Sequence, residues 1–166
     1  MVRRTVDASS AEVWATLSDF AGYGRWIPLT TMVIDPAPVR VGWAFAGRTG
    51  LGSLGFVDSM IVTRWEPPNG HAGDGEGGGA DGDGDDDGVD EARFTVRKTG
   101  RLLRGWADIT LRRRADGGTD VTWAEEIILG PERLGRRIAP LVDPVVARLF
   151  ARALDQMLAA TPGRGR

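Results

Sequence analysis

Apolar and polar residues alternate over most of this chain, and a period of two predicts a protein built mainly of β-strands. The first predicted strand covers residues 2–6. A short helix is predicted next, because Ser9-Ser10-Ala11-Glu12 matches a capping box, in which the Ser9 hydroxyl and the Glu12 carboxylate each accept from the other's backbone amide. The apolar residues of this helix fall on one stripe: Val13, Trp14, Leu17 and Phe20.

Six further segments have the pattern of strands: 29–35, 40–48, 54–66, 92–99, 101–114 and 119–129. In 40–48, the large residues Val41, Trp43 and Phe45 alternate with glycine and alanine, which gives that strand one bulky face. Glycines at 47, 50 and 52 predict a turn before the next strand. Asp116-Gly117-Gly118 predicts the turn of the last hairpin.

The C-terminal part predicts a short helix that opens at Pro131, followed by a long amphipathic helix from about residue 141 to 159. At 1.5 Å per residue the long helix would extend ~28 Å, enough to cross the sheet. The order of elements therefore predicts an α+β fold, a curved antiparallel sheet of about seven strands wrapped around this helix. One helix covers such a sheet incompletely, and we expect the gap to be an apolar pocket.

Composition narrows the possible functions. The chain has 166 residues, of which 42% are apolar, so we expect one domain over 1–160 and a disordered tail over 161–166. There is no cysteine and one histidine, His71, which excludes disulfides, thiolate metal sites, a Ser-His-Asp triad and a multi-histidine site. We expect neither a metal nor a cofactor.

Charge is distributed unevenly. Segment 69–91 is rich in glycine and acidic residues, and we expect it to be a mobile loop inserted between two strands. Asp83, Asp85 and Asp87 match the first half of an EF-hand loop, but Phe94 stands where the closing glutamate belongs, so an acidic loop is favoured over a calcium site. Without residues 70–91 the chain carries 14 acidic and 21 basic residues. The arginines are spread out and not interleaved with aromatics, which favours a solvated surface over nucleic-acid binding.

The sequence also bears on location. No apolar run approaches the ~18 residues of a membrane span, and the chain opens on a strand-like segment with no apolar signal core. We therefore expect a cytoplasmic protein without a membrane span, as a monomer or a homodimer. The arginine-rich, lysine-poor composition suggests a bacterial source.

Alternation also places two acidic residues on apolar faces. Asp58 shares a face with Phe56, Met60 and Val62, and Glu125 shares one with Val121, Trp123, Ile127 and Leu129. A carboxylate among apolar side chains must be paired or protonated, and buried acids with a raised pKa are candidates for general acid–base catalysis. The alternative is a structural ion pair with an arginine such as Arg48 or Arg104, or a bulge that turns the acid to solvent.

Five features together resemble the START-like (SRPBCC) superfamily with the helix-grip fold: Ala8 to Trp14, Tyr23-Gly24-Arg25-Trp26-Ile27-Pro28, Trp65-Glu66-Pro67-Pro68, Gly118 to Trp123, and the closing helix. More narrowly, the chain is similar to polyketide cyclase/dehydrase-type members of the group that includes Bet v 1 proteins, lipid-transfer domains and aromatase/cyclases. The resemblance covers the chain except 69–91. It implies a ligand cavity between the sheet and the C-terminal helix.

The resemblance also implies candidate site residues. Aromatase/cyclases use a pocket arginine to polarise a polyketide carbonyl, and Arg48 follows the corresponding strand, although it would face the cavity only if Gly47 made a bulge. The catalytic candidates are therefore Arg48, Asp58 and Glu125. The ligand-binding candidates are Tyr23, Trp26, Trp43, Phe45, Phe56, Met60, Trp123, Leu149 and Ala153.

The expected function is binding of a small hydrophobic ligand: a polyketide, a lipid or an aromatic metabolite. Two alternatives stay open. The protein could be a cyclase, aromatase or dehydrase that needs no metal or redox cofactor. It could also be a protein-interaction module that uses its acidic loop or its basic surface.

Overall fold

The fold is taken from a computed structural model of the chain. The structure describes residues 1–51, 54–68, 91–130, 148–149 and 151–162. The inserted acidic segment with its calcium-like motif, the short helix expected after Pro131 and the first part of the long helix lie outside the described residues.

The described elements are seven strands, one α-helix and one 3-10 helix, followed by helical residues near the C-terminus. In chain order they are β1 (Val2–Val6), α1 (Ser10–Leu17), η1 (Phe20–Arg25), β2 (Thr30–Ile34), β3 (Ala44–Leu51), β4 (Leu54–Glu66), β5 (Glu91–Thr99), β6 (Leu103–Arg113) and β7 (Thr119–Leu129). Residues 148–149 and 151–160 are helical and are called the C-terminal helix below.

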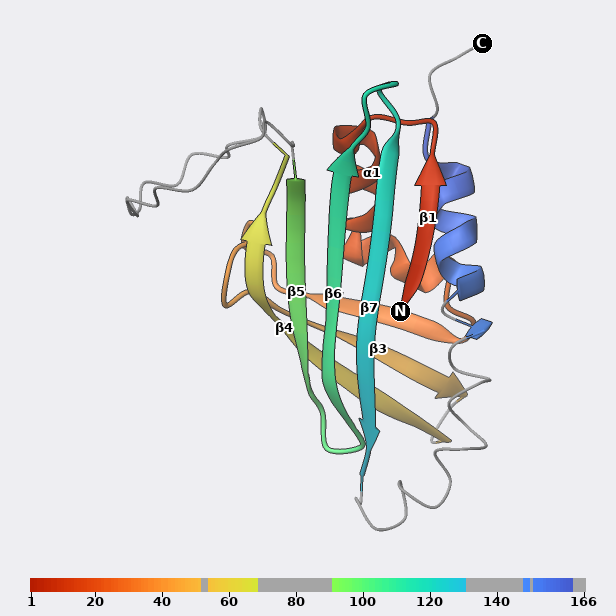
Figure 1. The fold of residues 1–166 in the computed structure, drawn as a ribbon. Coiled ribbons are helices and arrows are strands. Elements are labelled where there is room, and N and C mark those ends of the chain that lie inside the picture. The colour runs from red at the N-terminus through yellow and green to blue at the C-terminus, as the bar shows by residue number, and fades with distance from the viewer. Residues whose placement is uncertain (52–53, 69–90, 131–147, 150, 163–166) are drawn as a thin grey trace.

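All seven strands belong to one antiparallel sheet with the order β1-β7-β6-β5-β4-β3-β2. Consecutive strands from β2 to β7 pair with each other, and β1 closes the far edge on β7. The sheet is strongly bent, and α1 and the C-terminal helix lie on the same side of it (Figure 1). The structure thus has the α+β helix-grip architecture that the sequence predicts.

The capping box of α1 forms as its sequence predicts. The Glu12 amide donates to Ser9 Oγ at 3.3 Å, and the Ser9 amide donates to Glu12 Oε2 at 2.8 Å. The break expected after this helix is a 3-10 helix, η1, at whose start the Asp19 carboxylate accepts from the Gly22 amide at 3.0 Å. This turn carries Phe20 and Tyr23 into the core.

The third strand differs from its prediction. Val41 and Gly42 lie in a turn, with Gly42 at φ +88°, and β3 begins only at Ala44. The strand then continues through Gly47 and Gly50, where the sequence predicts a turn. These glycines pair regularly with β4, so small residues within a strand were misread as turn residues.

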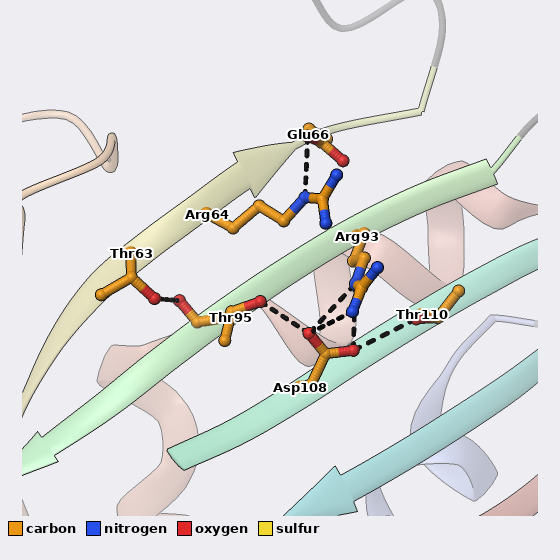
Figure 2. A network of polar contacts seen from close by, with 7 residues as sticks. All are labelled: Thr63, Arg64, Glu66, Arg93, Thr95, Asp108 and Thr110. Carbon is orange, nitrogen blue, oxygen red and sulfur yellow. Dashed lines mark hydrogen bonds and ion pairs between the residues drawn. The ribbon is translucent and has the colours of Figure 1, made fainter. Parts of the chain in front are cut away.

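The two faces of the sheet differ in character. Along β5 the residues facing the helices are buried, whereas the alternate residues Arg93 and Thr95 lie on the outer face. There Asp108 accepts from Arg93 Nε at 3.0 Å and from Thr95 Oγ1 at 2.6 Å (Figure 2). Polar side chains thus satisfy one another outside, and the apolar residues are left to the concave side.

Candidate ligand-binding cavity

A cavity of about 490 Å³ lies between the concave face of the sheet and the C-terminal helix. Strands β2 to β7 and η1 supply most of its wall. The C-terminal helix closes one side with Leu149, Ala153, Leu154 and Met157. This volume is in the range of small-molecule sites.

The wall is predominantly apolar. The large apolar side chains of the sheet and η1 that line it are Phe20, Ile27, Met32, Phe45, Phe56, Met60, Phe94, Val96, Leu103, Ile109, Trp123, Ile127 and Leu129. They face inward because inward and outward positions alternate along each strand. An apolar molecule bound here would bury apolar surface against this wall.

One place in the wall is ionic. Lys98 Nζ lies 2.5 Å from Asp58 Oδ2, and the exposed fractions of the two side chains are 5% and 14%. Glu125 lies on the same wall and is half-buried. We call Lys98, Asp58 and Glu125 the polar cluster.

Strand register explains why these three residues lie on the same wall of the cavity. Lys98 on β5 pairs with Met60 on β4 and with Gly105 on β6, and Asp58 lies two residues before Met60, on the same face. Between Lys98 and Glu125, strand β6 has the small residues Gly105 and Ala107, which pair with Ile127 and Glu125. Small residues on the intervening strand therefore leave the polar groups open to the cavity.

Electrostatics distinguish Glu125 from an ordinary surface acid. Burial raises the pKa of the Glu125 carboxyl, and the charge of Lys98 and hydrogen bonding with Trp123 oppose this rise. Its ionised form is therefore disfavoured relative to a solvated glutamate. A carboxyl of this kind can donate or accept a proton more readily near neutral pH.

Tyr23 lines the cavity, but its hydroxyl is already used. Its Oη donates to the Leu17 carbonyl at 2.5 Å, and burial raises the pKa of the phenol. Tyr23 therefore stays neutral and ties η1 to the end of α1. It presents mainly its ring to the cavity.

Most of the candidate residues lie on the cavity wall. Those that do are Tyr23, Phe45, Phe56, Asp58, Met60, Trp123, Glu125, Leu149 and Ala153. The structure does not bring Arg48, Trp43 or Trp26 there.

Arg48 requires a correction. It is exposed on the outer face, because β3 pairs without a bulge and Gly47 and Thr49 take the inward positions. The expectation of a cavity arginine at this position is therefore wrong. Arg48 and Arg104 are both exposed, and the cation beside Asp58 is Lys98.

The two tryptophans expected at the ligand also lie elsewhere. Trp43 is 3% exposed, and its Nε1 donates to the carbonyls of Asp35 and Ala37 at 3.0 and 2.8 Å. Its ring packs on Phe20 and Phe45, behind the cavity wall. Trp26 is half-buried and packs against the same core without lining the cavity.

Sequence reasoning missed Lys98. Two signals were present: alternation along β5 puts Lys98 in phase with Ala92, Phe94 and Val96, and Lys98 is the only lysine in the chain. A lone lysine in phase with buried apolar residues predicts a cation on the inner face of the sheet. The described residues contain no group of three or more histidines, cysteines, aspartates or glutamates placed to hold a metal ion.

The fold and the site define a class of protein: a helix-grip domain with an internal apolar cavity. The chain belongs to the family described as "Polyketide cyclase / dehydrase and lipid transport", whose model matches residues 2–161. Among curated proteins, none matches the chain. No helix in the described part is long and apolar enough to cross a membrane.

Solved structures show the same fold at low sequence identity. The Zhui aromatase/cyclase from Streptomyces sp. R1128 is 13% identical with a TM-score of 0.62, over 98% of this chain and 96% of that one. Hypothetical protein jhp0584 from Helicobacter pylori is 10% identical with a TM-score of 0.63, over 97% and 86%. A norcoclaurine synthase mutant from Thalictrum flavum is 12% identical with a TM-score of 0.57, over 95% and 91%.

Proposed function

We propose that this protein binds one small, mainly apolar molecule in the cavity between the sheet and the C-terminal helix. The observation that carries the proposal is a space of about 490 Å³ whose described wall is mainly apolar and includes the polar cluster. Such a site gains affinity from apolar burial and orients its ligand through few polar groups. Membership of a family described by cyclase, dehydrase and lipid-transport functions supports the proposal.

The test is binding of Nile red, a neutral dye whose fluorescence rises in apolar surroundings. We expect one dye per protein. Ala153→Phe projects a ring from the C-terminal helix into the cavity and should weaken binding at least ~10-fold by removing buried contact area. Ala159→Phe is the matched control, since Ala159 is exposed on the same helix. Equal affinities of the two variants would contradict the assigned cavity.

A second candidate function is cyclase or dehydrase chemistry on a carbonyl compound. It is favoured by Glu125, whose raised pKa suits proton transfer, beside Lys98, whose ammonium could hold a carbonyl oxygen. Asp58 would hold the Lys98 side chain in place through their ion pair, and Arg48 would have no part. The structural likeness to an aromatase/cyclase supports this candidate through the fold alone.

The enzyme is tested with a synthetic poly-β-keto thioester as substrate and mass spectrometry of the products. Glu125→Gln should abolish turnover and still bind Nile red, whereas Glu126→Gln, at the exposed neighbouring position, should turn over normally. If the native protein did not turn over this substrate, the result would contradict the enzyme function and support the carrier function.

The protein-interaction alternative depends largely on the acidic segment, which lies outside the described residues. Deletion of residues 71–90 separates it from the carrier function. A carrier should bind Nile red with unchanged affinity after this deletion, because all the described residues that line the cavity are kept in the shortened chain.

A further inference from the structure

The Lys98 ammonium has hydrogen-bonding capacity to spare. It carries three N–H donors, of which one is directed to Asp58 Oδ2 at 2.5 Å. Among the described residues, its other contact is Met60 Sδ at 3.9 Å, a weak acceptor. Because Lys98 lines the cavity, a ligand oxygen could accept from the remaining donors.

Asp58 offers the complementary group. Its Oδ1 is buried and has no hydrogen-bond partner among the described residues. A buried carboxylate oxygen without a donor is costly, and a ligand that supplies the donor removes that cost. Because Asp58 and Lys98 both line the cavity, the cluster offers an acceptor and a donor next to each other on its wall.

We propose that the polar cluster selects a neutral hydroxyl group: a phenol, an alcohol or the enol of a β-dicarbonyl. The hydroxyl oxygen accepts from Lys98, and the hydroxyl hydrogen goes to Asp58 Oδ1. The inference deepens the proposed function and rests on it, since the rest of the ligand occupies the apolar cavity.

The charges of the polar cluster disfavour three other polar groups that an apolar ligand could carry in place of a hydroxyl. A fatty-acid carboxylate would add an anion to a site whose cation Lys98 is already paired with Asp58 and shared with Glu125. A ligand ammonium would compete with Lys98 for the same Asp58 carboxylate. A neutral ether accepts from Lys98 but leaves Asp58 Oδ1 without a donor.

The experiment compares ligands of one size by isothermal titration calorimetry at pH 7. The probes are 2-naphthol, 2-methoxynaphthalene, 2-naphthoate and 2-naphthylmethylammonium. We expect 2-naphthol to bind at least ~10-fold more tightly than each of the others, as expected when a hydrogen bond to a charged group is gained. Equal or tighter binding of the carboxylate or the ammonium would overturn the inference.

A double variant tests the origin of this preference. Lys98→Met/Asp58→Leu replaces the ion pair with apolar groups of similar size, an exchange that buried pairs often tolerate without loss of stability. The preference for 2-naphthol over 2-methoxynaphthalene should fall to within ~3-fold. Arg93→Met/Asp108→Leu is the control, because it removes an ion pair from the outer face and should leave the preference intact.

A direct readout needs no variant. Lysine labelled with ¹³C at Cε gives one side-chain NMR signal in this chain, that of Lys98. Saturation with 2-naphthol should shift this signal, and saturation with 2-methoxynaphthalene should shift it less. An unmoved signal would overturn the inference. If Nile red binds and no naphthalene probe does, the inference fails while the proposed function stands; if none of them binds, both fail.

Discussion

At the scale of single residues, the sequence indicates which acidic residues lie on the apolar wall of the cavity, but not which cation pairs with them. Alternation alone puts Asp58 and Glu125 on apolar faces, and both line the cavity. Their partner could not be chosen from the same pattern, because pairing depends on the register between β4 and β5, which sequence alternation does not define. An arginine was expected there, and Lys98 is found.

Loss of the Lys98 charge should destabilise the fold. Lys98→Met leaves the Asp58 carboxylate buried without a cation, and we expect a loss of about 3 kcal/mol or more in the free energy of unfolding. Urea denaturation measures it. The double variant Lys98→Met/Asp58→Leu should recover most of this loss, and Arg97→Met, at an exposed neighbour, should stay within ~0.5 kcal/mol of the native protein. If Lys98→Met were as stable as the native protein, the result would contradict a buried ion pair between Lys98 and Asp58.

Glu125 should make stability depend on pH. Its pKa in the folded protein is raised by burial above the ordinary value of 4.5, so the folded state holds its proton more tightly than the unfolded chain does. The corresponding stabilisation is complete below pH 4.5 and is lost as pH rises through the folded-state pKa. Glu125→Gln should therefore exceed the native protein in stability at pH 8, and the difference should shrink as pH falls toward 4.5.

Denaturation curves at several pH values measure this difference. Glu126→Gln, which removes an exposed acid one position along β7, is the control and should follow the native pH profile closely. If Glu125→Gln and Glu126→Gln had the same profile, Glu125 would be ionising as it does in water.

At the scale of elements, local signals with a direct chemical cause predict best. The strand over 54–66 has the bounds of β4, and the capping box and the last hairpin form where expected. Errors arise at glycines, because a glycine can mark either a turn or a position inside a strand where a side chain would not fit. Gly47 sits inside β3 because its missing side chain makes room near Thr30 and Met32, a tertiary reason that a turn signal cannot reveal.

The N-cap of α1 should be worth about 1 kcal/mol. Ser9→Ala removes the acceptor of the Glu12 amide and the side-chain bond from Ser9 Oγ to Glu12 Oε2 at 2.7 Å. Thermal unfolding should show this loss. Ser18→Ala, at the other end of the helix, is the control, because the backbone N–H of residue 18 donates to the Trp14 carbonyl and is kept when serine is replaced by alanine. An undiminished melting temperature for Ser9→Ala would contradict the capping role.

Two glycines with positive φ should differ in their need for glycine. A Cβ on Gly105, at φ +124°, would lie 1.9 Å from the Glu126 carbonyl oxygen, which belongs to the paired backbone of β7. A Cβ on Gly42, at φ +88°, would meet nothing within 4 Å. Gly42→Ala should therefore lower the free energy of unfolding by about 1 kcal/mol, through backbone strain alone. Gly105→Ala should lower it by about 3 kcal/mol or more, and chemical denaturation measures both losses. Equal costs would contradict the close approach of β6 and β7.

At the scale of the whole molecule, the order of elements predicts an antiparallel sheet covered by a helix, because a sheet with one apolar face must be covered by the helices that the chain supplies. The family resemblance adds the helix-grip arrangement of these elements. The cavity follows from incomplete cover and was predicted with it. Its contents were less predictable. Trp43 was expected at the ligand, yet it fills the core behind the wall, because its indole nitrogen is bound by the loop carbonyls of Asp35 and Ala37.

A protein with a cavity of this kind should gain stability when a ligand binds in it. At a free 2-naphthol concentration of 100 times the dissociation constant, binding to the folded state alone stabilises it by about 2.7 kcal/mol. For a chain of this size that corresponds to a rise of roughly 5–10 °C in melting temperature.

The variant Ala153→Phe tests whether this rise comes from the cavity. Without ligand it should melt at or above the melting temperature of the native protein, because its ring fills cavity space. With 2-naphthol its melting temperature should rise little further. Ala159→Phe should respond as the native protein does. If both variants gained the same rise, 2-naphthol would be binding outside the cavity, and the link between incomplete helix cover and ligand binding would be lost.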